Sequence, residues 1–297
     1  MKYISTFLDY MEHEKRCSPH TLLSYRLDLN SFHKHLEKYQ SDPDEICNQP
    51  KIIRSWLVDM MDSGIGTRSV NRKISTLKSF YKYLLRHGYI ESNPMNKVLS
   101  PKSPHKLPGF VEKDGMNELL DNVEFGEDFR GVRNKLIIDC LYQTGIRLSE
   151  LTGLKDSDID MYDLSVRVIG KRNKERIVPI TVTLKNAFEH YIQLRNQEFS
   201  FTGEKEGYFF LTDKARKLYP KFVYRIVHSY LELVTTLERK SPHILRHTFA
   251  THMLNSGADL NAIKELLGHA NLAATQVYTH NTFEKLKKAY KQAHPRA

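Results

Sequence analysis

The chain has 297 residues, 40% of them hydrophobic and 27% charged, a balance typical of a folded globular protein with room for two domains. Lys and Arg number 45 against 35 Asp and Glu, so the formal net charge is +10, and both the first hundred residues and the remainder are basic. No apolar run is long enough to span a membrane, and the N-terminus lacks the apolar stretch of a signal peptide. The charge favours a polyanionic partner such as nucleic acid, although a solvated basic surface would also explain it.

The three cysteines, Cys17, Cys47 and Cys140, are far apart in the sequence. Their odd number and wide spacing fit neither a disulfide framework nor a zinc site, which indicates a reducing compartment. Cys140 lies in the apolar run IIDCLY and is expected in the core.

The first hundred residues predict four amphipathic helices. The first carries Ile4, Phe7, Leu8 and Met11. The second begins at Ser18-Pro19, an N-cap residue followed by a proline at the first helical position. The third follows Pro50, and the fourth covers residues 67–86. We expect a separate helical domain over residues 1–100.

The predicted helix at residues 67–86 has two distinct faces. One repeats apolar residues at spacings of three and four and is expected in the core: Val70, Ile74, Leu77, Tyr81 and Leu84. The opposite face carries cations and hydroxyl groups: Arg68, Arg72, Ser75, Ser79 and Lys82. Such a face suits a helix that lies on DNA phosphates, and equally a face that is only solvated.

A proline-rich stretch follows, and we expect a semi-extended linker at residues 101–108. The second domain is then expected over residues 109–297, mostly helical, with one β-hairpin. Its strands are predicted at Ser165–Ile169 and Glu175–Ile180, because polar and apolar residues alternate there on either side of the charged segment GKRNK.

The segment SPHILRHTFATH predicts a helix that starts with chemistry of its own. Ser241 is a suitable N-cap and Pro242 a suitable first residue. His243 and Arg246, three apart, share a face near the helix N-terminus, where backbone N–H groups and the dipole favour a phosphate. The spacing of His243 to His247 also allows a metal site, but no carboxylate or cysteine cluster accompanies it. We therefore expect no metal, and without a phosphate-binding glycine loop we expect no nucleotide cofactor.

Five other residues are candidates, and most of them also have a simpler structural explanation. Arg147 and Glu150 in TGIRLSEL also fit an ordinary intrahelical ion pair, and Lys171 at the hairpin tip also fits a solvated charge. His269 follows the helix-ending Gly268, and Tyr278 lies in TQVYTH, where a core tyrosine is the usual interpretation.

Together, TGIRLSEL, VIGKRNKER, SPHILRHTFATH, LLGHA and TQVYTH closely resemble the active-site segments of tyrosine recombinases, in particular the bacterial Xer group. The resemblance implies that Tyr278 is the nucleophile and that Arg147 and Arg246 hold the scissile phosphate, with Glu150 supporting Arg147. It assigns the general acid to Lys171, with Lys174 as the alternative, a proton-transfer role to His243 and a further hydrogen bond to His269.

The resemblance spans nearly the whole chain. It implies a mainly α fold with a small β-sheet, in which a SAM-like helical core-binding domain and a catalytic domain form a C-shaped clamp on double-stranded DNA. Four protomers, of one kind or together with a second Xer recombinase, would assemble on two recombination sites built of inverted half-sites. A DNA translocase is a possible regulator. The expected location is the cytoplasm, with the nucleoid.

The length favours a chromosome-dimer-resolving Xer protein over an integrase of a mobile element, and details lean toward the XerD type of the XerC/XerD pair. A type IB topoisomerase, a non-catalytic DNA-binding protein and a metal-dependent nuclease are the rival hypotheses. In the C-terminal tail, Phe283, Leu286 and Tyr290 form an apolar stripe that suits docking on a neighbouring subunit, or packing on the tail's own domain.

Overall fold

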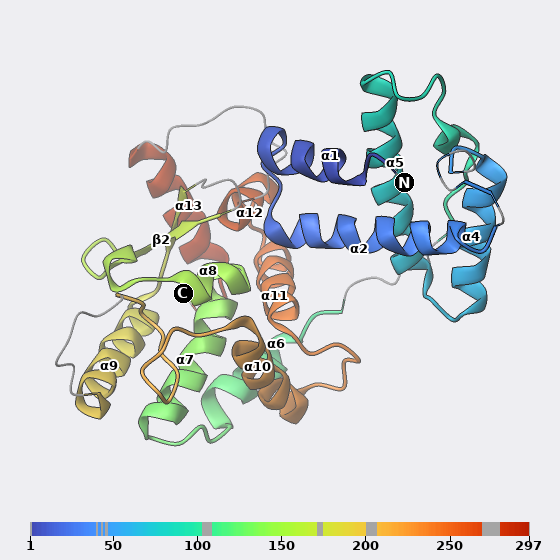
Figure 1. Ribbon diagram of the computed structural model, residues 1–297. Helices are drawn as coiled ribbons and strands as arrows, with labels where there is room; N and C mark the ends of the chain where they lie inside the picture. Colours follow the sequence, from blue (N-terminus) through green and yellow to red (C-terminus); the bar gives the residue numbers. More distant parts are fainter. Residues whose placement is uncertain are drawn as a thin grey trace. The chain divides into compact units, whose positions relative to one another are not determined.

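The computed structural model divides the protein into two compact units, Met1–Lys106 and Leu107–Ala297, each with its own hydrophobic core (Figure 1). It describes residues 2–39, 41–42, 44, 47–102, 109–170, 175–199, 207–268 and 280–296, with the backbone alone for residues 280–282. Over these residues the secondary structure is helical apart from one small sheet and two isolated β-bridges, which confirms the predicted mainly α fold. None of the described helices is long and apolar enough to cross a membrane.

The N-terminal unit contains the four predicted helices. Ser18 caps the second of them, since its hydroxyl group accepts a hydrogen bond from the backbone N–H of Thr21. The first helix ends in one π-helical turn, and a 3-10 turn follows the fourth. The elements are α1 (Ile4–Asp9), η1 (Tyr10–Glu14), α2 (Pro19–Leu36), α4 (Pro50–Asp62), α5 (Thr67–Arg86) and η2 (Pro94–Lys97).

Helix α5 has the two faces that its sequence predicts. All five apolar residues of the expected core face are buried against α2 and α4. Of the opposite face, Arg68, Arg72, Ser75 and Lys82 are exposed, and Ser79 is half-buried. The polar face is therefore accessible to a ligand of the N-terminal unit.

A buried carboxylate joins α2 to α5. The side chain of Asp28 is only 1% exposed. It accepts hydrogen bonds from the Lys73 ammonium group at 3.1 Å and the Thr76 hydroxyl at 2.8 Å, and it forms an ion pair with Arg72. A buried charge is tolerated only when it is paired and hydrogen-bonded, so Asp28 fixes how α5 lies on α2. Arg72 remains half-exposed on the polar face while this contact anchors it.

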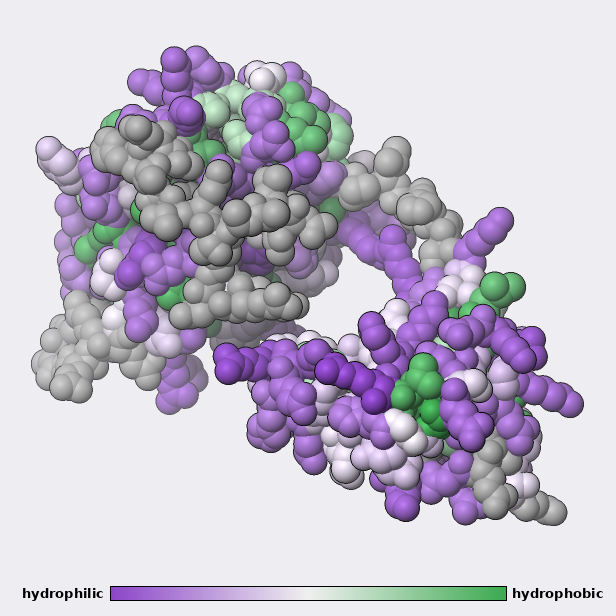
Figure 2. Space-filling model, turned by 90° about the horizontal axis from the view of Figure 1, so that it is seen from above, coloured by the Kyte–Doolittle hydropathy of each residue, from purple (hydrophilic) through white to green (hydrophobic). Residues whose placement is uncertain are grey.

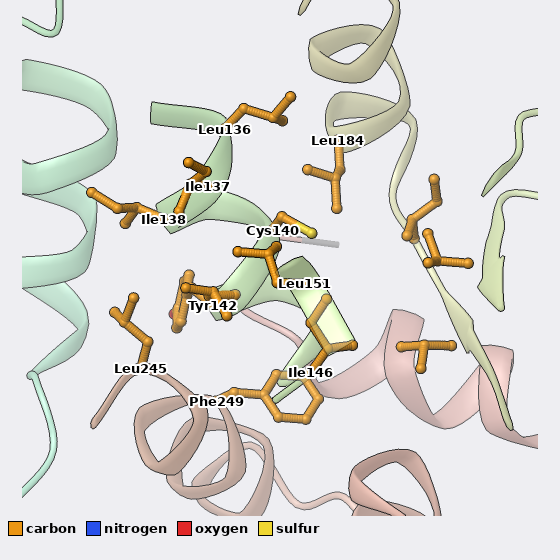
Figure 3. Close-up of a cluster of buried hydrophobic side chains, with 14 of the residues drawn as sticks. Leu136, Ile137, Ile138, Cys140, Tyr142, Ile146, Leu151, Leu184, Leu245 and Phe249 are labelled. Atoms are coloured by element: carbon orange, nitrogen blue, oxygen red, sulfur yellow. The ribbon is translucent and has the colours of Figure 1, made fainter. Parts of the chain in front are cut away.

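The second unit is built around α7, which packs against α9 and α11. Figure 3 shows the central cluster, in which Ile137 and Cys140 of α7 lie among side chains of α8, α9 and α11. Cys140 is buried in the core, as its apolar surroundings in the sequence predict. The helices are α6 (Lys113–Asn117), η3 (Glu118–Asn122), α7 (Phe129–Thr144), α8 (Leu148–Gly153), η4 (Asp156–Asp158), α9 (Val182–Glu198), α10 (Pro220–Val234), α11 (Pro242–Asn255), α12 (Leu260–Leu267) and α13 (His280–Ala293).

The sheet is antiparallel with the strand order β1-β2-β3. Strands β2 (Ser165–Ile169) and β3 (Glu175–Pro179) form the predicted hairpin. The short strand β1 (Ile159–Asp160), which pairs with the start of β2, was not predicted, since two residues are too few to show an alternating pattern. On the buried face Val168 lies opposite Arg176, an unexpected residue for a core position.

The C-terminal helix α13 packs on its own unit. It contacts α11, α12 and β3, and burial of Leu286 and Tyr290 places both in the core of that unit. Beyond it, Arg296 donates two hydrogen bonds to the carboxylate of Asp121, at 3.0 and 2.9 Å. Leu286 and Tyr290 of the tail's apolar stripe therefore pack within the same chain, and docking of the tail on a neighbouring subunit stays a prediction. Figure 2 shows that, on the face turned to the viewer, the described residues are largely hydrophilic.

Candidate active site

Three arginine side chains converge on the C-terminal end of α12. The last carbonyl groups of a helix lack partners within the helix and carry partial negative charge, so guanidinium groups suit them well. The three hydrogen bonds run from Arg176 Nε to Leu266 O (2.7 Å), from Arg246 Nη2 to Leu267 O (2.6 Å) and from Arg147 Nη2 to Gly268 O (3.0 Å). Three consecutive carbonyls thus bind three arginines that come from different elements.

Glu150 links two of these arginines. Its carboxylate accepts hydrogen bonds from the backbone N–H and Nη1 of Arg147, at 2.7 and 2.8 Å, and from Nη1 and Nη2 of Arg176, at 2.8 and 2.9 Å. Its side chain is 1% exposed. Burial alone would raise the pKa of this carboxyl, but the hydrogen bonds and charge of Arg176, with the hydrogen bonds from Arg147, lower the pKa to about 2. Glu150 is therefore ionised in the folded protein at neutral pH.

A tight turn between α7 and α8 places Arg147 in this cluster. Helix α7 ends at Gly145 in the left-handed conformation, with φ 59°, and Arg147 is the N-cap of α8. A β-carbon on Gly145 would lie 2.5 Å from Cδ1 of Phe249, so this position requires glycine for both conformation and space. The side chain of Arg147 stays 31% exposed, and the guanidinium group is therefore accessible from solvent.

Arg246 is hydrogen-bonded both to the turn at Gly145 and to the end of α12. Its Nη1 donates to Gly145 O at 2.6 Å while its Nη2 binds the end of α12. Burial, together with the positive charges of Arg147 and Arg176, lowers the pKa of Arg246 to about 10, so the side chain is still protonated at neutral pH. The predicted buried face of α11, Leu245, Phe249 and Met253, is fully buried and fixes the helix that carries Arg246.

His243 lies at the start of α11 and is exposed, one turn before Arg246. The other two histidines of that segment differ from it. His247 is half-buried, and His252 is buried with its Nδ1 hydrogen-bonded to the hydroxyl of Tyr142 at 2.8 Å. Among the described residues, no group of three His, Cys, Asp or Glu side chains lies together as a metal site.

Three of the predicted site residues lie outside the described residues. Lys171, with its alternative Lys174, belongs to the segment between Gly170 and Glu175. His269 and Tyr278 belong to the segment between Gly268 and His280. The structure thus brings Arg147, Glu150 and Arg246 into one cluster and places His243 one helical turn from Arg246.

Arg176 was missed by the sequence prediction. A signal was present, because alternation along β3 places Arg176 on the same face as the buried Val178 and Ile180. An arginine on the buried face of a strand requires a carboxylate or carbonyl partner, and Glu150 supplies one. Identifying that partner required the fold, since the two residues are on different elements.

The amino-acid sequence and the fold both match known proteins along the whole chain. A model of the phage integrase family matches residues 109–285, and a model of the phage integrase N-terminal SAM-like domain matches residues 4–88. The chain belongs to the phage integrase family. It is 37% identical to the tyrosine recombinase XerC of Chlorobaculum tepidum, an alignment that covers all of this chain and 95% of the relative. It is 38% identical to XerC of Halalkalibacterium halodurans, covering all of this chain and 98% of the relative.

Solved structures agree on the fold of this phage integrase family member. The crystal structure of the XerH site-specific recombinase in a post-cleavage complex with a palindromic difH substrate aligns with a TM-score of 0.73. The alignment covers 96% of this chain and 83% of XerH at 20% identity. With the XerC relatives, these findings confirm the predicted enzyme class, a site-specific tyrosine recombinase of Xer type. The relatives quoted are XerC proteins and give no support to the expected leaning toward XerD.

Proposed function

We propose that this recombinase cuts and rejoins double-stranded DNA through a 3′-phosphotyrosyl intermediate on Tyr278. The observation that carries the proposal is the arginine cluster at the end of α12. Arg147 and Arg246 bind neighbouring carbonyls there, although 99 residues separate them in the sequence. Two guanidinium groups in one frame suit the two non-bridging oxygens of a phosphodiester.

The reaction needs a nucleophile and two proton transfers. The phenolic oxygen of Tyr278 attacks the phosphorus, a bond forms between them, and the bond from phosphorus to the 5′ oxygen breaks. His243 takes the phenolic proton and returns it in the reverse step. Lys171, or Lys174 in its place, gives a proton to the departing 5′ oxygen. Because the phosphotyrosyl ester keeps the bond energy for rejoining, the chemistry needs no ATP. The arginines supply the positive charge that a metal ion would otherwise supply, so we expect no metal ion.

The remaining residues bind and stabilise the phosphate. Arg147 and Arg246 hold the non-bridging oxygens as negative charge increases on them, and His269 donates a further hydrogen bond. Glu150 keeps Arg147 in place through its two hydrogen bonds to that residue. Arg147 needs the fixed fork of a guanidinium group, for which lysine is a poor substitute.

The N-terminal unit supplies the second DNA-binding surface. The polar face of α5, with Arg68, Arg72, Ser75, Ser79 and Lys82, is accessible and would contact the phosphate backbone. We propose that residues 1–100 and 109–297, joined by the linker at 101–108, close as a C-shaped clamp around the duplex.

The biological role proposed is that of the Xer relatives. The substrate would be a recombination site of two inverted half-sites, and the active species a tetramer of this chain alone or with a second Xer recombinase. Resolution of chromosome dimers at segregation, in the cytoplasm with the nucleoid and with a DNA translocase as possible regulator, fits the full-length similarity to XerC. Recombination for a mobile element is the alternative role.

The test is to trap the covalent adduct. A duplex site would be selected by the full-length protein from a randomised library, and a nick near the scissile phosphate would let the 5′-hydroxyl fragment diffuse away. We expect a protein–DNA band on denaturing gels in EDTA, absent in Tyr278→Phe and present in the control Tyr162→Phe, whose side chain is exposed on a turn. Relaxation of plasmids without such sites would point to a topoisomerase, and activity lost in EDTA to a nuclease. Binding without any adduct, even with a partner recombinase added, would refute the proposal.

A further inference from the structure

We propose that Arg176 is a positioning residue for the recombination reaction, a role that rests on the function proposed above. It holds Glu150 and the end of α12 in one fixed relation, and through them it sets the orientation of Arg147. Its side chain is 4% exposed, and its Nε, Nη1 and Nη2 all donate to Glu150 or Leu266 O, so it acts through these neighbours.

The guanidinium group of Arg176 donates hydrogen bonds from two of its edges. Nη1 and Nη2 donate to the two carboxylate oxygens of Glu150, at 2.8 and 2.9 Å, and Nε donates to Leu266 O at 2.7 Å. A bidentate pair fixes the plane of the carboxylate as well as its position. The third hydrogen bond ties that plane to the backbone of α12.

Without Arg176, Glu150 would hold Arg147 less rigidly. Each of its carboxylate oxygens accepts one hydrogen bond from Arg147 and one from Arg176. If Arg176 were lost, the carboxylate would keep only its two hydrogen bonds to Arg147 and would rotate more easily about its terminal bond, which is a soft torsion. The Arg147 guanidinium group would follow that rotation, because it is bound to the same oxygens.

A close backbone contact makes the second connection. Helix α12 ends at Gly268 in the left-handed conformation, with φ 65°. A β-carbon on Gly268 would lie 3.2 Å from both Cδ and Nη1 of Arg176, so the side chain packs directly on this glycine. Gly268 O is the acceptor for Arg147, and the next residue is His269. Arg176 therefore fixes the point at which the chain leaves α12 for two of the proposed catalytic residues.

The chain offers a matched control in Arg195. This arginine is equally buried and donates to both carboxylate oxygens of Asp156, at 2.8 and 3.0 Å, and to Phe209 O at 2.8 Å. It has the same kinds of bond as Arg176, but it joins α9 to Asp156 of η4 and to Phe209, not to Glu150 or the end of α12. A purely structural role for Arg176 would make the two arginines equivalent in their effect on the reaction.

The test compares Arg176→Lys with Arg195→Lys in the full-length protein, on the selected nicked site. Binding affinity, the single-turnover rate of adduct formation and the folded fraction by circular dichroism would be measured for each. Since misplacement of a catalytic group by about 1 Å costs about 100-fold in rate, we expect Arg176→Lys to react about 100-fold slower per folded molecule, with affinity changed less than about threefold. Arg195→Lys should react at the wild-type rate per folded molecule.

Two further measurements separate positioning from other roles. A substrate with sulfur in place of the bridging 5′ oxygen has a leaving group that needs no proton, so it should rescue Lys171→Ala but leave Arg176→Lys slow. The double variant Arg147→Lys/Arg176→Lys should be no slower than Arg147→Lys alone, because both act through one guanidinium group.

The outcomes are distinct. If Arg176→Lys matches Arg195→Lys in rate per folded molecule, or if its defect is one of binding only, the positioning role is wrong while the proposed function stands. Rescue of Arg176→Lys by the sulfur substrate would also overturn it. If the wild-type protein forms no adduct that depends on Tyr278, the proposed function fails, and the role of Arg176 fails with it.

Discussion

Replacing Glu150 with glutamine should destabilise the catalytic unit selectively. Glutamine has the shape of glutamate but lacks the charge, and its amide nitrogen cannot accept any of the four hydrogen bonds that the carboxylate receives. The substitution would leave Arg176 as a buried cation without its anion. Breaking a buried pair in this way typically costs about 3–5 kcal/mol.

The pKa of Glu150 gives an independent magnitude. A fall from 4.5 in the unfolded chain to about 2 in the folded protein corresponds to about 3 kcal/mol of stability at neutral pH. Because the folded pKa lies below the unfolded one, this contribution is complete above about pH 5 and is lost as pH falls toward about 2. At about pH 3.5, on the order of 1 kcal/mol of it should already be gone.

The chain permits an assay with an internal reference. Its one tryptophan, Trp56, is buried in the N-terminal unit, so tryptophan fluorescence follows that unit, while far-ultraviolet circular dichroism follows the helices of both. In urea titrations at about pH 7, Glu150→Gln should lower the stability of the catalytic unit by about 3 kcal/mol and leave the fluorescence transition unchanged. The difference in stability between Glu150→Gln and wild type should narrow by on the order of 1 kcal/mol at about pH 3.5.

Glu175→Gln is the control, since the Glu175 carboxylate lies about half exposed on β3, next to Arg176. Its substitution should change the stability by less than about 0.5 kcal/mol. Equal effects of the two substitutions would contradict the reasoning. So would a gap between Glu150→Gln and wild type that stays constant from neutral to acidic pH, because the stabilisation would then not depend on the carboxylate charge.

Three further outcomes are expected. Gly145→Ala should destabilise the catalytic unit by at least about 1 kcal/mol in thermal melts, whereas Gly153→Ala, with nothing within 4 Å of the new methyl group, should not. Asp28→Asn should lower the stability of the N-terminal unit by about 3 kcal/mol, measured by tryptophan fluorescence, and an unchanged midpoint would show that its three contacts are dispensable. Lys82→Ala should reduce the salt dependence of DNA binding by about one released counterion, while Lys51→Ala on α4 should leave it unchanged. Equal slopes of log affinity against log salt concentration for the two variants would remove the α5 face from the interface.

Local signals were sufficient for most of the fold. Proline at the first position places the starts of α2, α4 and α11, and the spacing of apolar residues assigns the core face of α5. Such signals are contained within one element, so they can be read without knowing the partner element. The same is true of the ion pair between Arg147 and Glu150, which are three residues apart.

Signals that depend on two distant elements were not predictable. Arg176 has meaning only beside Glu150 and Leu266, which are on α8 and α12. The packing of the C-terminal tail could not be predicted for a related reason. An apolar stripe indicates that one face of a helix is buried, but it does not identify the element or subunit that covers it. Leu286 and Tyr290 are buried in the core of the same chain, and docking of the tail on a neighbouring subunit stays a prediction.

The charges of the cluster fit the charge that the proposed reaction develops. Arg147, Arg176 and Arg246 with Glu150 leave two net positive charges at one helix end. A phosphodiester carries one negative charge, and the five-coordinate phosphorus of the transition state places a second on its non-bridging oxygens. The charge of these four residues therefore matches the transition state more closely than the substrate, which is the condition for binding energy to accelerate the reaction. Glu150→Gln would leave three mutually repelling cations, so its loss of rate should come with its loss of stability.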